Sequence, residues 1–339
     1  MTTSTAPAAT DTYGVGIVGL GRVSRGHGQA LKNAKGAKLI VACDIDEARV
    51  ARFTDDFGCE GETDLDHMLA RPDVQIVDVL LPHVLHEEAT IKAARAGKHI
   101  MVEKPMAMEV AACDRMIAAA KASGVKLFIA HTERFIEATR TAKRILDSGQ
   151  VGTPVMATDV WYQPFRRETR QPWMLDRSRG GGFLQMAGSH MIDRLVFLLG
   201  APVKTARASV RTAYHPDIKC DDAVLAFLEL ENGIPCTFAT TSYKDTANAG
   251  VEAHATEIHC TDGMVKVDKR SRVYVSKGGA YEEVPVERDS AVKREWELFA
   301  EAIANDAEPP IPLEHARHVV AVMEACEESS ASGKTITVS

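Results

Sequence analysis

The chain of 339 residues has no run of about 20 apolar residues, the length that a membrane-spanning helix needs. It has no excess of basic residues either: 40 lysines and arginines stand against 47 aspartates and glutamates, a net charge of −7. A negative chain is repelled by the phosphates of nucleic acids and of anionic lipid surfaces. We therefore expect a small-molecule substrate as the main partner, with no nucleic acid and no membrane.

Paired cysteines are also missing, because the seven cysteines are an odd number, lie far apart and form no C-x-x-C pair. Such a pattern is typical of reduced thiols in the cytoplasm. Residues 1–12 lack the basic residues and the apolar core of a secretory signal, and they are interpreted as a disordered tail. The sequence therefore predicts a cytoplasmic protein.

Short apolar runs alternate with helical patterns over residues 13–132, which predicts an α/β domain with a doubly wound parallel sheet. The expected strands are Val15–Gly19, Leu39–Cys43, Ile76–Leu81, Ile100–Val102 and Leu127–Ala130. The expected helices are Gln29–Asn33, Asp46–Phe57, His86–Ala96 and Glu109–Ser123.

Longer alternating segments separated by turn signals follow over residues 133–339, which predicts a second α/β domain with a large open, mostly antiparallel sheet. Its expected strands are Val155–Tyr162, Val203–Ala213, Ala223–Leu230, Thr237–Tyr243, Glu252–Cys260, Met264–Val267 and Arg272–Val275. Its expected helices are Ile136–Ser148, Lys293–Asn305 and Leu313–Ser330, the last of which can pack back on the first domain.

A glycine turn follows the first expected strand. Gly19 allows a sharp strand-to-helix turn, and Gly21 lets a pyrophosphate approach bare backbone next to the positive end of a helix. Asp44 ends the next strand, where its carboxylate would accept hydrogen bonds from the ribose hydroxyls and would repel a 2′-phosphate. The pattern predicts a Rossmann domain that prefers NAD.

The third glycine of this fingerprint is absent, since Ser24 stands in its place. The context of strand, turn, helix and acid compensates for that loss. We expect the backbone of Arg22, Val23 and Ser24 to contact the cofactor, and Arg22 and Ser24 leave room for NADP.

Two further clusters carry residues suited to chemistry. Glu103-Lys104-Pro105 ends a strand of the parallel sheet, where ligands bind in open α/β folds. A run of three glycines at 180–182 precedes a helix on which Met186, His190 and Asp193 share one face, and we interpret these glycines as clearing room for a ligand. Without that context, Lys104 would be a surface lysine and His190 a core histidine.

Together these motifs resemble the Gfo/Idh/MocA family of NAD(P)-dependent oxidoreductases over essentially the whole chain. Supporting matches are Pro82-x-x-x-His86, Ala96-Gly97-Lys98-His99 and Glu133-Arg134-Phe135. The resemblance implies that Lys104 and His190 are catalytic and that the chain forms a homodimer or homotetramer. Leu81, His86, Glu103 and Lys104 would contact the cofactor.

The chain departs from that family at Met186, where an aspartate usually precedes the histidine by one helical turn. A thioether cannot orient an imidazole or bind a sugar hydroxyl as a carboxylate does. Arginines and aromatic residues from Trp161 to Arg179 suit a ring acid, and they suit a subunit contact equally well. The substrate residues that we expect are Met186, Arg134, Trp173, Arg166 and Asp193.

The preferred interpretation is an oxidoreductase that transfers a hydride between nicotinamide and a secondary alcohol or ketone on a sugar, an inositol or a sugar derivative. Two alternatives stay open. One is a dehydrogenase of a cis-dihydrodiol or hydroxy-semialdehyde from aromatic-acid breakdown, and the other is a non-catalytic NAD(H) sensor. The histidine pairs His83/His86 and His315/His318 lack further ligands at zinc-like spacing, so no metal is expected.

Overall fold

A computed structural model describes residues 12–244, 253–268 and 270–339. The expected tail, apart from Thr12, and the first residue of the expected strand Glu252–Cys260 lie outside these ranges. The chain divides into two compact units. The first contains the described residues up to Ala107 together with Ala111–Thr132 and Ser290–Arg317, and the second contains Met108–Val110, Glu133–Asp289 and His318–Ser339.

The first unit is built on a six-stranded parallel sheet in the order β3-β2-β1-β4-β5-β6. Its strands are β1 (Tyr13–Val18), β2 (Ala37–Cys43), β3 (Glu60–Glu62), β4 (Ile76–Val79), β5 (His99–Glu103) and β6 (Leu127–Ala130). Its helices are α1 (Ser24–Leu31), α2 (Glu47–Phe57), α3 (Leu65–Ala70), α4 (His86–Arg95), α5 (Val110–Ser123) and α8 (Ala291–Ala304). This order is that of a Rossmann fold and confirms the predicted class.

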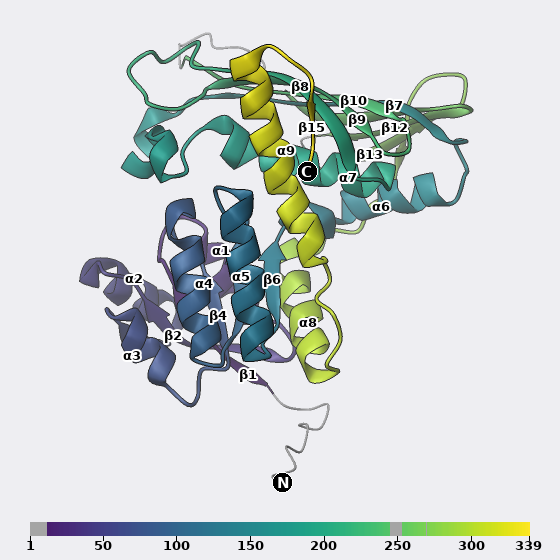
Figure 1. Ribbon diagram of the computed structural model, residues 1–339. Helices are drawn as coiled ribbons and strands as arrows, with labels where there is room; N and C mark the ends of the chain where they lie inside the picture. The colour runs from purple at the N-terminus through teal and green to yellow at the C-terminus, as the bar shows by residue number, and fades with distance from the viewer. Residues whose placement is uncertain (1–11, 245–252, 269) are drawn as a thin grey trace. The chain divides into compact units, whose positions relative to one another are not determined.

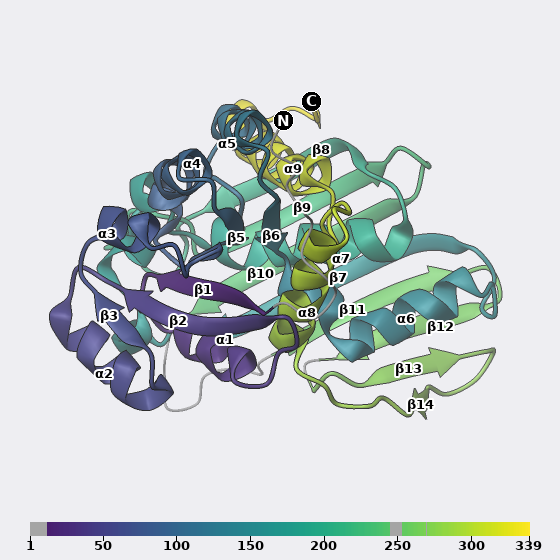
Figure 2. The same ribbon diagram turned by 90° about the horizontal axis from the view of Figure 1, so that it is seen from below.

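Helices cover both faces of this sheet, with α1 and α8 on one side and α4 and α5 on the other (Figure 2). The strands β1, β4 and β5 are therefore buried on both faces and are almost continuously apolar. Asp78, in the middle of β4, is fully buried and is the exception.

The first helix differs from the prediction, because α1 begins at Ser24 and not near Gln29. Its sequence contains Gly26 and Gly28, which lower helix propensity, so the pattern gave no helical signal there. Packing explains the helix: a Cβ at Gly28 would lie 2.9 Å from the ring of Phe57, so α1 lies close against α2.

The second unit contains a nine-stranded sheet in the order β14-β13-β12-β11-β7-β10-β9-β8-β15. Its strands are β7 (Pro154–Pro164), β8 (Val203–Arg211), β9 (Ala223–Leu230), β10 (Pro235–Tyr243), β11 (Ala253–Cys260), β12 (Gly263–Asp268), β13 (Val273–Ser276), β14 (Glu282–Val284) and β15 (Ile336–Thr337). All neighbours are antiparallel except β7 and β10, which run parallel. The sheet is therefore mostly antiparallel, as predicted.

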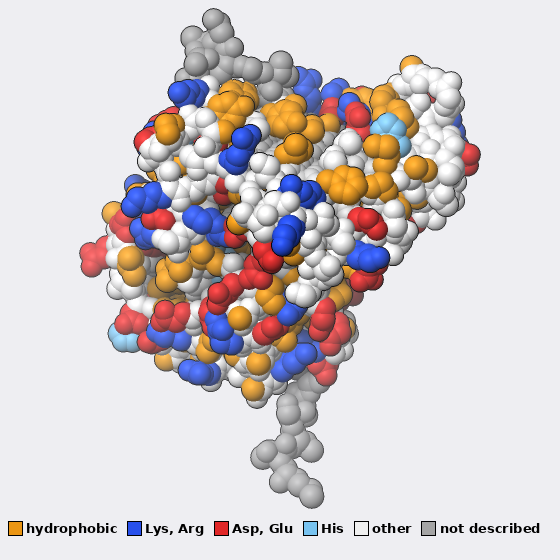
Figure 3. Space-filling model, turned by 45° about the horizontal axis from the view of Figure 1, so that its top comes forward, with side chains coloured by type: hydrophobic (Ala, Val, Ile, Leu, Met, Phe, Trp, Pro, Cys, Tyr) orange, Lys and Arg blue, Asp and Glu red, His pale blue; other side chains and the backbone are white. Residues whose placement is uncertain are grey.

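One face of this sheet carries α6 (Glu137–Asp147) and α7 (Ser189–Leu199), while α9 (Leu313–Ser332) runs into the unit from residue 318 (Figure 1). Apolar side chains remain exposed on β7 and β9, among them Leu225 and Phe227 of β9. Figure 3 shows hydrophobic side chains on the surface of the described chain. No helix among the described residues has the length and apolar character to span a membrane.

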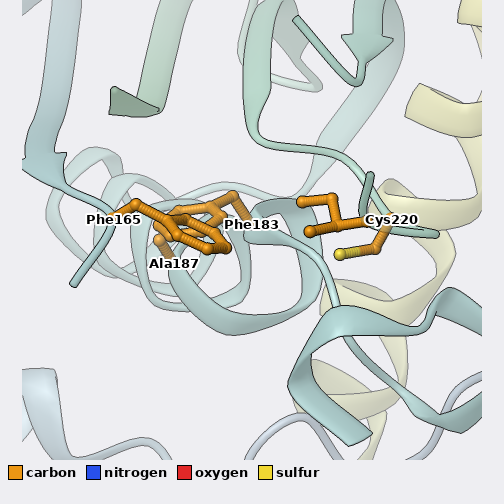
Figure 4. Packing of buried hydrophobic residues seen from close by; sticks show 5 residues of the cluster. Phe165, Phe183, Ala187 and Cys220 are labelled. Atoms are coloured by element: carbon orange, nitrogen blue, oxygen red, sulfur yellow. The ribbon is translucent and has the colours of Figure 1, made fainter. Parts of the chain in front are cut away.

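The segment rich in arginine and tryptophan forms three short 3-10 turns, at Arg167–Thr169, Pro172–Leu175 and Arg177–Arg179. A small apolar cluster of Phe165, Phe183, Ala187, Ile218 and Cys220 lies at its base (Figure 4). Trp161 and Leu175 pack against this cluster. The cluster therefore anchors both ends of the segment to the second unit.

Candidate functional site

The glycine turn lies between β1 and α1 and has the geometry that a dinucleotide needs. Gly19 has φ +93°, and a Cβ there would lie 2.6 Å from the carbonyl oxygen of Leu80. A Cβ at Gly21 would meet no atom within 4 Å, so the backbone borders open space. The turn therefore fits a pyrophosphate at the N-terminus of α1, where Arg22 and Val23 are exposed.

Ser24 replaces the third glycine without loss of packing. Its side chain is buried, and its hydroxyl donates to the carbonyl oxygen of Gly21 over 2.7 Å. The serine thus fixes the turn from within, and its hydroxyl lies inside the protein.

Asp44, at the end of β2, holds the same turn from the other side. Its Oδ2 accepts from the backbone N–H of Leu20 over 2.8 Å, and its Oδ1 accepts from that of Asp46 over 3.0 Å. A guanidinium nitrogen of Arg49 lies 3.6 Å from Oδ2. Each carboxylate oxygen keeps a second lone pair, so the residue can accept ribose hydroxyls while anchoring the turn.

His86 has a structural role that the sequence did not indicate. It is fully buried, with Nε2 2.9 Å from the carbonyl oxygen of Leu81 and Nδ1 3.0 Å from that of Pro105. Burial lowers its pKa, so the ring is neutral and one nitrogen donates. This side chain therefore braces the segments after β4 and β5, and its expected contact with the cofactor stays a prediction.

Glu103 and Lys104 follow at the end of β5. The Oε2 of Glu103 accepts from the backbone N–H of Lys104 over 3.0 Å, and its Oε1 lies 3.7 Å from Nε2 of His27. The Glu103 carboxylate is thus directed into the protein, and the Lys104 side chain is half-buried at the carboxyl edge of the sheet.

A buried group of charges lies behind Glu103. His27 of α1 is 2.8 Å from Asp78 through Nδ1, and both are fully buried. Burial lowers the pKa of His27, but Asp78 and Glu103 outweigh it and raise that pKa well above its usual value. The imidazole is therefore a cation between two carboxylates.

Glu295 of α8 belongs to the same group and is also fully buried. Its Oε2 accepts from the Thr132 hydroxyl over 3.1 Å. Burial raises its pKa well above the usual range, so the carboxyl is neutral. A charged residue inside an apolar strand, as Asp78 is, was the one sequence signal that could have revealed this group.

In the second unit, His190 and Met186 are half-buried on one face, among buried neighbours. Residues Leu184–Gly188 form a π-helical turn that runs directly into α7. Met186 and His190 therefore share a half-exposed face as predicted, whereas Asp193, which was expected on the same face, is fully buried. The first turn is wider than that of an α-helix.

The glycines before this helix make room for the chain itself. A Cβ at Gly181 would lie 2.5 Å from the Met174 carbonyl oxygen, and one at Gly182 would lie 2.1 Å from Oδ1 of Asp221. The other oxygen of Asp221 accepts from the Leu184 N–H over 2.7 Å. The interpretation that they clear space for a ligand is thus corrected.

Arg134 and Asp193 contact each other, and their expected roles as substrate residues stay a prediction. Nε of Arg134 donates to Oδ1 of Asp193 over 2.7 Å, and Asp193 is fully buried. The neighbouring residues repeat the pairing, because Arg194 donates to Glu133 over 2.7 Å. Adjacent opposite charges thus join the 3-10 turn Thr132–Phe135 to α7.

Arg194 also makes a bidentate ion pair with Asp159 of β7, with nitrogen–oxygen distances of 2.8 to 2.9 Å. Both side chains are buried. Burial raises the pKa of Asp159 to about 6, against the opposing effect of the guanidinium. Sequence analysis missed this pair, although a charged residue inside the expected strand Val155–Tyr162 was a signal.

Internal contacts account for several arginines of the segment 166–179. Arg167 pairs with Asp217 over 2.6 Å, Arg170 donates to the Phe165 carbonyl oxygen over 3.0 Å, and Arg177 pairs with Glu327. Arg166 is exposed with φ 49°, and Trp173 is half-buried. The expected substrate contacts of Arg166 and Trp173 stay a prediction. No group of three or more metal-ligating side chains occurs in the described ranges.

Comparisons with known proteins agree with this architecture. A family model described as "Oxidoreductase family, NAD-binding Rossmann fold" (GFO_IDH_MocA) matches residues 13–131. A second, "GFO/IDH/MocA C-terminal domain", matches residues 139–266. The fold and the glycine turn define an NAD-binding Rossmann oxidoreductase with a second sheet domain. The chain belongs to the GFO/IDH/MocA family and is an NAD(P)-dependent oxidoreductase, which confirms the predicted resemblance.

The curated relatives act on different substrates. A 2,7-anhydro-N-acetylneuraminate hydratase of Mediterraneibacter gnavus is 28% identical over 76% of this chain and 67% of that protein. A 1,5-anhydro-D-fructose reductase of Ensifer adhaerens is 25% identical over 95% of this chain and 98% of that protein.

A 1-carboxy-3-chloro-3,4-dihydroxycyclohexa-1,5-diene dehydrogenase of Comamonas testosteroni is 28% identical over 68% of this chain, which spans 58% of that protein. Among solved structures, levoglucosan dehydrogenase in complex with NADH and L-sorbose has a TM-score of 0.87. It is 21% identical and covers 97% of this chain and 99% of its own, which shows a shared fold.

Proposed function

We propose that the chain catalyses reversible oxidation of a secondary alcohol on a ring substrate of the sugar, anhydrosugar or cyclitol class. The observation that carries this proposal is the position of Lys104 at the carboxyl end of β5, on the same edge of the parallel sheet as a glycine turn that fits a dinucleotide. Relatives named for anhydrosugar chemistry support the substrate class.

NAD(H), when bound, supplies the acceptor or donor of the hydride. Lys104 places an ammonium beside the substrate oxygen, where negative charge develops as the hydroxyl loses its proton. His190 takes that proton, for which a neutral imidazole is suited near neutral pH. Glu103 fixes the backbone of Lys104 from behind. The candidates for substrate contact are Met186, Arg134, Trp173, Arg166 and Asp193.

The cofactor is NAD by preference, because the Asp44 carboxylate sits at the end of β2 where a 2′-phosphate would be repelled. We further propose that the protein is cytoplasmic and a homodimer or homotetramer, which the exposed Leu225 and Phe227 on the sheet face support.

The test is a screen at 340 nm with NAD⁺ and NADP⁺ against inositols, monosaccharides, anhydrosugars, sugar acids and aromatic cis-dihydrodiols. Lys104→Ala should lower kcat by roughly 10²–10⁴-fold and leave NADH binding nearly unchanged. Lys121→Ala removes an exposed lysine of α5 and serves as the matched control. Full activity in Lys104→Ala would remove this residue from the mechanism.

The outcome also separates the other interpretations. Activity confined to cis-dihydrodiols would support the aromatic substrate class, to which one relative belongs by name. NADH binding without turnover on any of these compounds would contradict the proposal and favour a sensor. The presence of both Lys104 and His190 supports catalysis, because a sensor has no need of them.

A further inference from the structure

Trp161 of β7 contacts two histidines of the second unit. Its indole stacks on His254 of β11, with ring centroids 4.2 Å apart and planes 12° from parallel. It also stacks on His190, with centroids 6.0 Å apart and planes 29° from parallel. The separation from His190 lies within the range of offset aromatic pairs. The imidazole of His190, the proposed proton acceptor, therefore packs against the indole of Trp161.

The backbone enforces this arrangement. His254 and Trp161 are direct cross-strand partners in the antiparallel pair of β11 and β7. Trp161 and Asp159 are two positions apart on one face of β7, and His190 and Arg194 are four positions apart on one face of α7. The bidentate pair of Arg194 with Asp159 fixes α7 on β7, and the stack of His190 on Trp161 lies one helical turn away.

The His254 ring that stacks on Trp161 is neutral. Burial and the nearby Arg194 guanidinium lower its pKa to about 3, which the Asp268 carboxylate opposes only in part. The ring thus stays uncharged over the working range of an enzyme. It does not compete with His190 for a proton, and it stacks on the indole.

Met186 stands one helical turn before His190, at the position where the family resemblance implies a carboxylate that orients the imidazole. We propose that Trp161 is the positioning residue that orients the His190 imidazole, with His254 holding the indole in place. The stack restricts rotation of the imidazole, so its ring nitrogen stays directed at the substrate hydroxyl. This inference rests on the proposed catalytic role of His190.

The kinetic test uses Trp161→Leu, which keeps an apolar side chain but removes the aromatic plane. We expect kcat to fall about tenfold or more, since misplacement of a catalytic group is costly, while KM and NADH binding stay nearly unchanged. Trp161→Phe should retain activity within about threefold. Tyr214→Leu controls for loss of an aromatic side chain elsewhere in the second unit, because Tyr214 is exposed and has no proposed role at the site.

A rescue distinguishes positioning from a purely structural effect. Met186→Asp added to Trp161→Leu supplies a carboxylate one turn before His190, and it should restore at least half of the lost kcat on a logarithmic scale. Unchanged kcat in Trp161→Leu, or a loss that Met186→Asp leaves in full, would overturn the proposal.

A spectroscopic readout is independent of turnover. An imidazolium quenches a stacked indole, so the tryptophan fluorescence of the intact protein should show a pH transition as His190 protonates. His190→Gln and Trp161→Phe should abolish this transition, and His254→Gln should retain it. A transition of undiminished amplitude in His190→Gln would overturn the proposal; a smaller transition that stays in both variants belongs to Trp296, whose ring contacts His27. Absence of turnover with the transition present would count against the proposed reaction and leave the stack intact.

Discussion

Arg194→Met tests whether the buried ion pair with Asp159 holds the second unit together. Methionine fills much of the volume of the arginine stem but leaves the Asp159 carboxylate without its guanidinium. Because Asp159 is 1% exposed, water cannot replace the lost partner. Loss of one partner of a buried pair typically costs about 3–5 kcal/mol.

The structure also gives the pH dependence of that cost. With Arg194 present, the pKa of Asp159 is raised to about 6 by burial. Without the guanidinium the pKa rises further, so the folded variant keeps a proton that the wild type has released above pH 6. Each pH unit of that difference costs about 1.4 kcal/mol, which gives about 3 kcal/mol at pH 8. Below pH 6 both folded proteins hold the proton, so the difference shrinks.

The difference in unfolding free energy between Arg194→Met and the wild type is measured by urea unfolding at pH 5.5, 7 and 8. Unfolding is followed by circular dichroism, and each transition is fitted separately. Arg144→Met is the control, because the Arg144 pair with Glu137 is exposed and such pairs contribute about 0–1 kcal/mol. In the double variant Arg194→Met/Asp159→Asn, the loss of unfolding free energy should no longer depend on pH, because residue 159 no longer titrates. An equal cost at pH 5.5 and pH 8 would refute the reasoning.

Two further changes probe the first unit. Asp44→Asn keeps an oxygen for the Leu20 N–H but loses the charge, so it should lower the ratio of kcat/KM for NAD⁺ over NADP⁺; Asp44→Ala should also weaken binding of both cofactors, because it frees the glycine turn. An unchanged ratio in Asp44→Asn would show that another residue reads the ribose. Glu295→Gln mimics the neutral carboxyl that burial enforces, so the Tm should change little near pH 5. Folded Glu295 keeps a proton that the unfolded chain releases above about pH 4.5, so the wild type loses folding stability as the pH rises. Glutamine does not titrate, so the Tm of the variant should rise relative to that of the wild type toward pH 9. A Tm difference that is the same at all pH values would contradict this.

The repeated alternation of strands and helices made the first unit predictable, because both faces of a parallel sheet require apolar runs. The short elements β3 and α3 escaped prediction, since three and six residues carry too little periodicity. The start of α1 was misplaced because its glycines hide a helix that tertiary packing stabilises.

The candidate site could be predicted only where residue type and backbone position coincide, as at Gly19, Gly21 and Lys104. Contacts between residues that are far apart in the sequence leave no pattern in the local sequence from which they could be predicted. Arg134 and Asp193 were therefore expected at the substrate, although the fold directs each to the other. The stack of Trp161 on His190 depends equally on how β7 packs against α7, which no spacing in the sequence reveals.

The wide turn at Leu184–Gly188 has a consequence for how this chain tolerates insertions and deletions. A π-helical turn holds about one residue more than an α-helical turn, and here it stands directly before His190. Removal of one residue from it can be absorbed by a tighter turn, with α7 kept in register by its ion pairs. The half-exposed position that Met186 occupies on the face of His190 would then be taken by the residue next to Met186 in the sequence. A single-codon deletion can in this way exchange the side chain before the histidine without disturbing the sheet beneath.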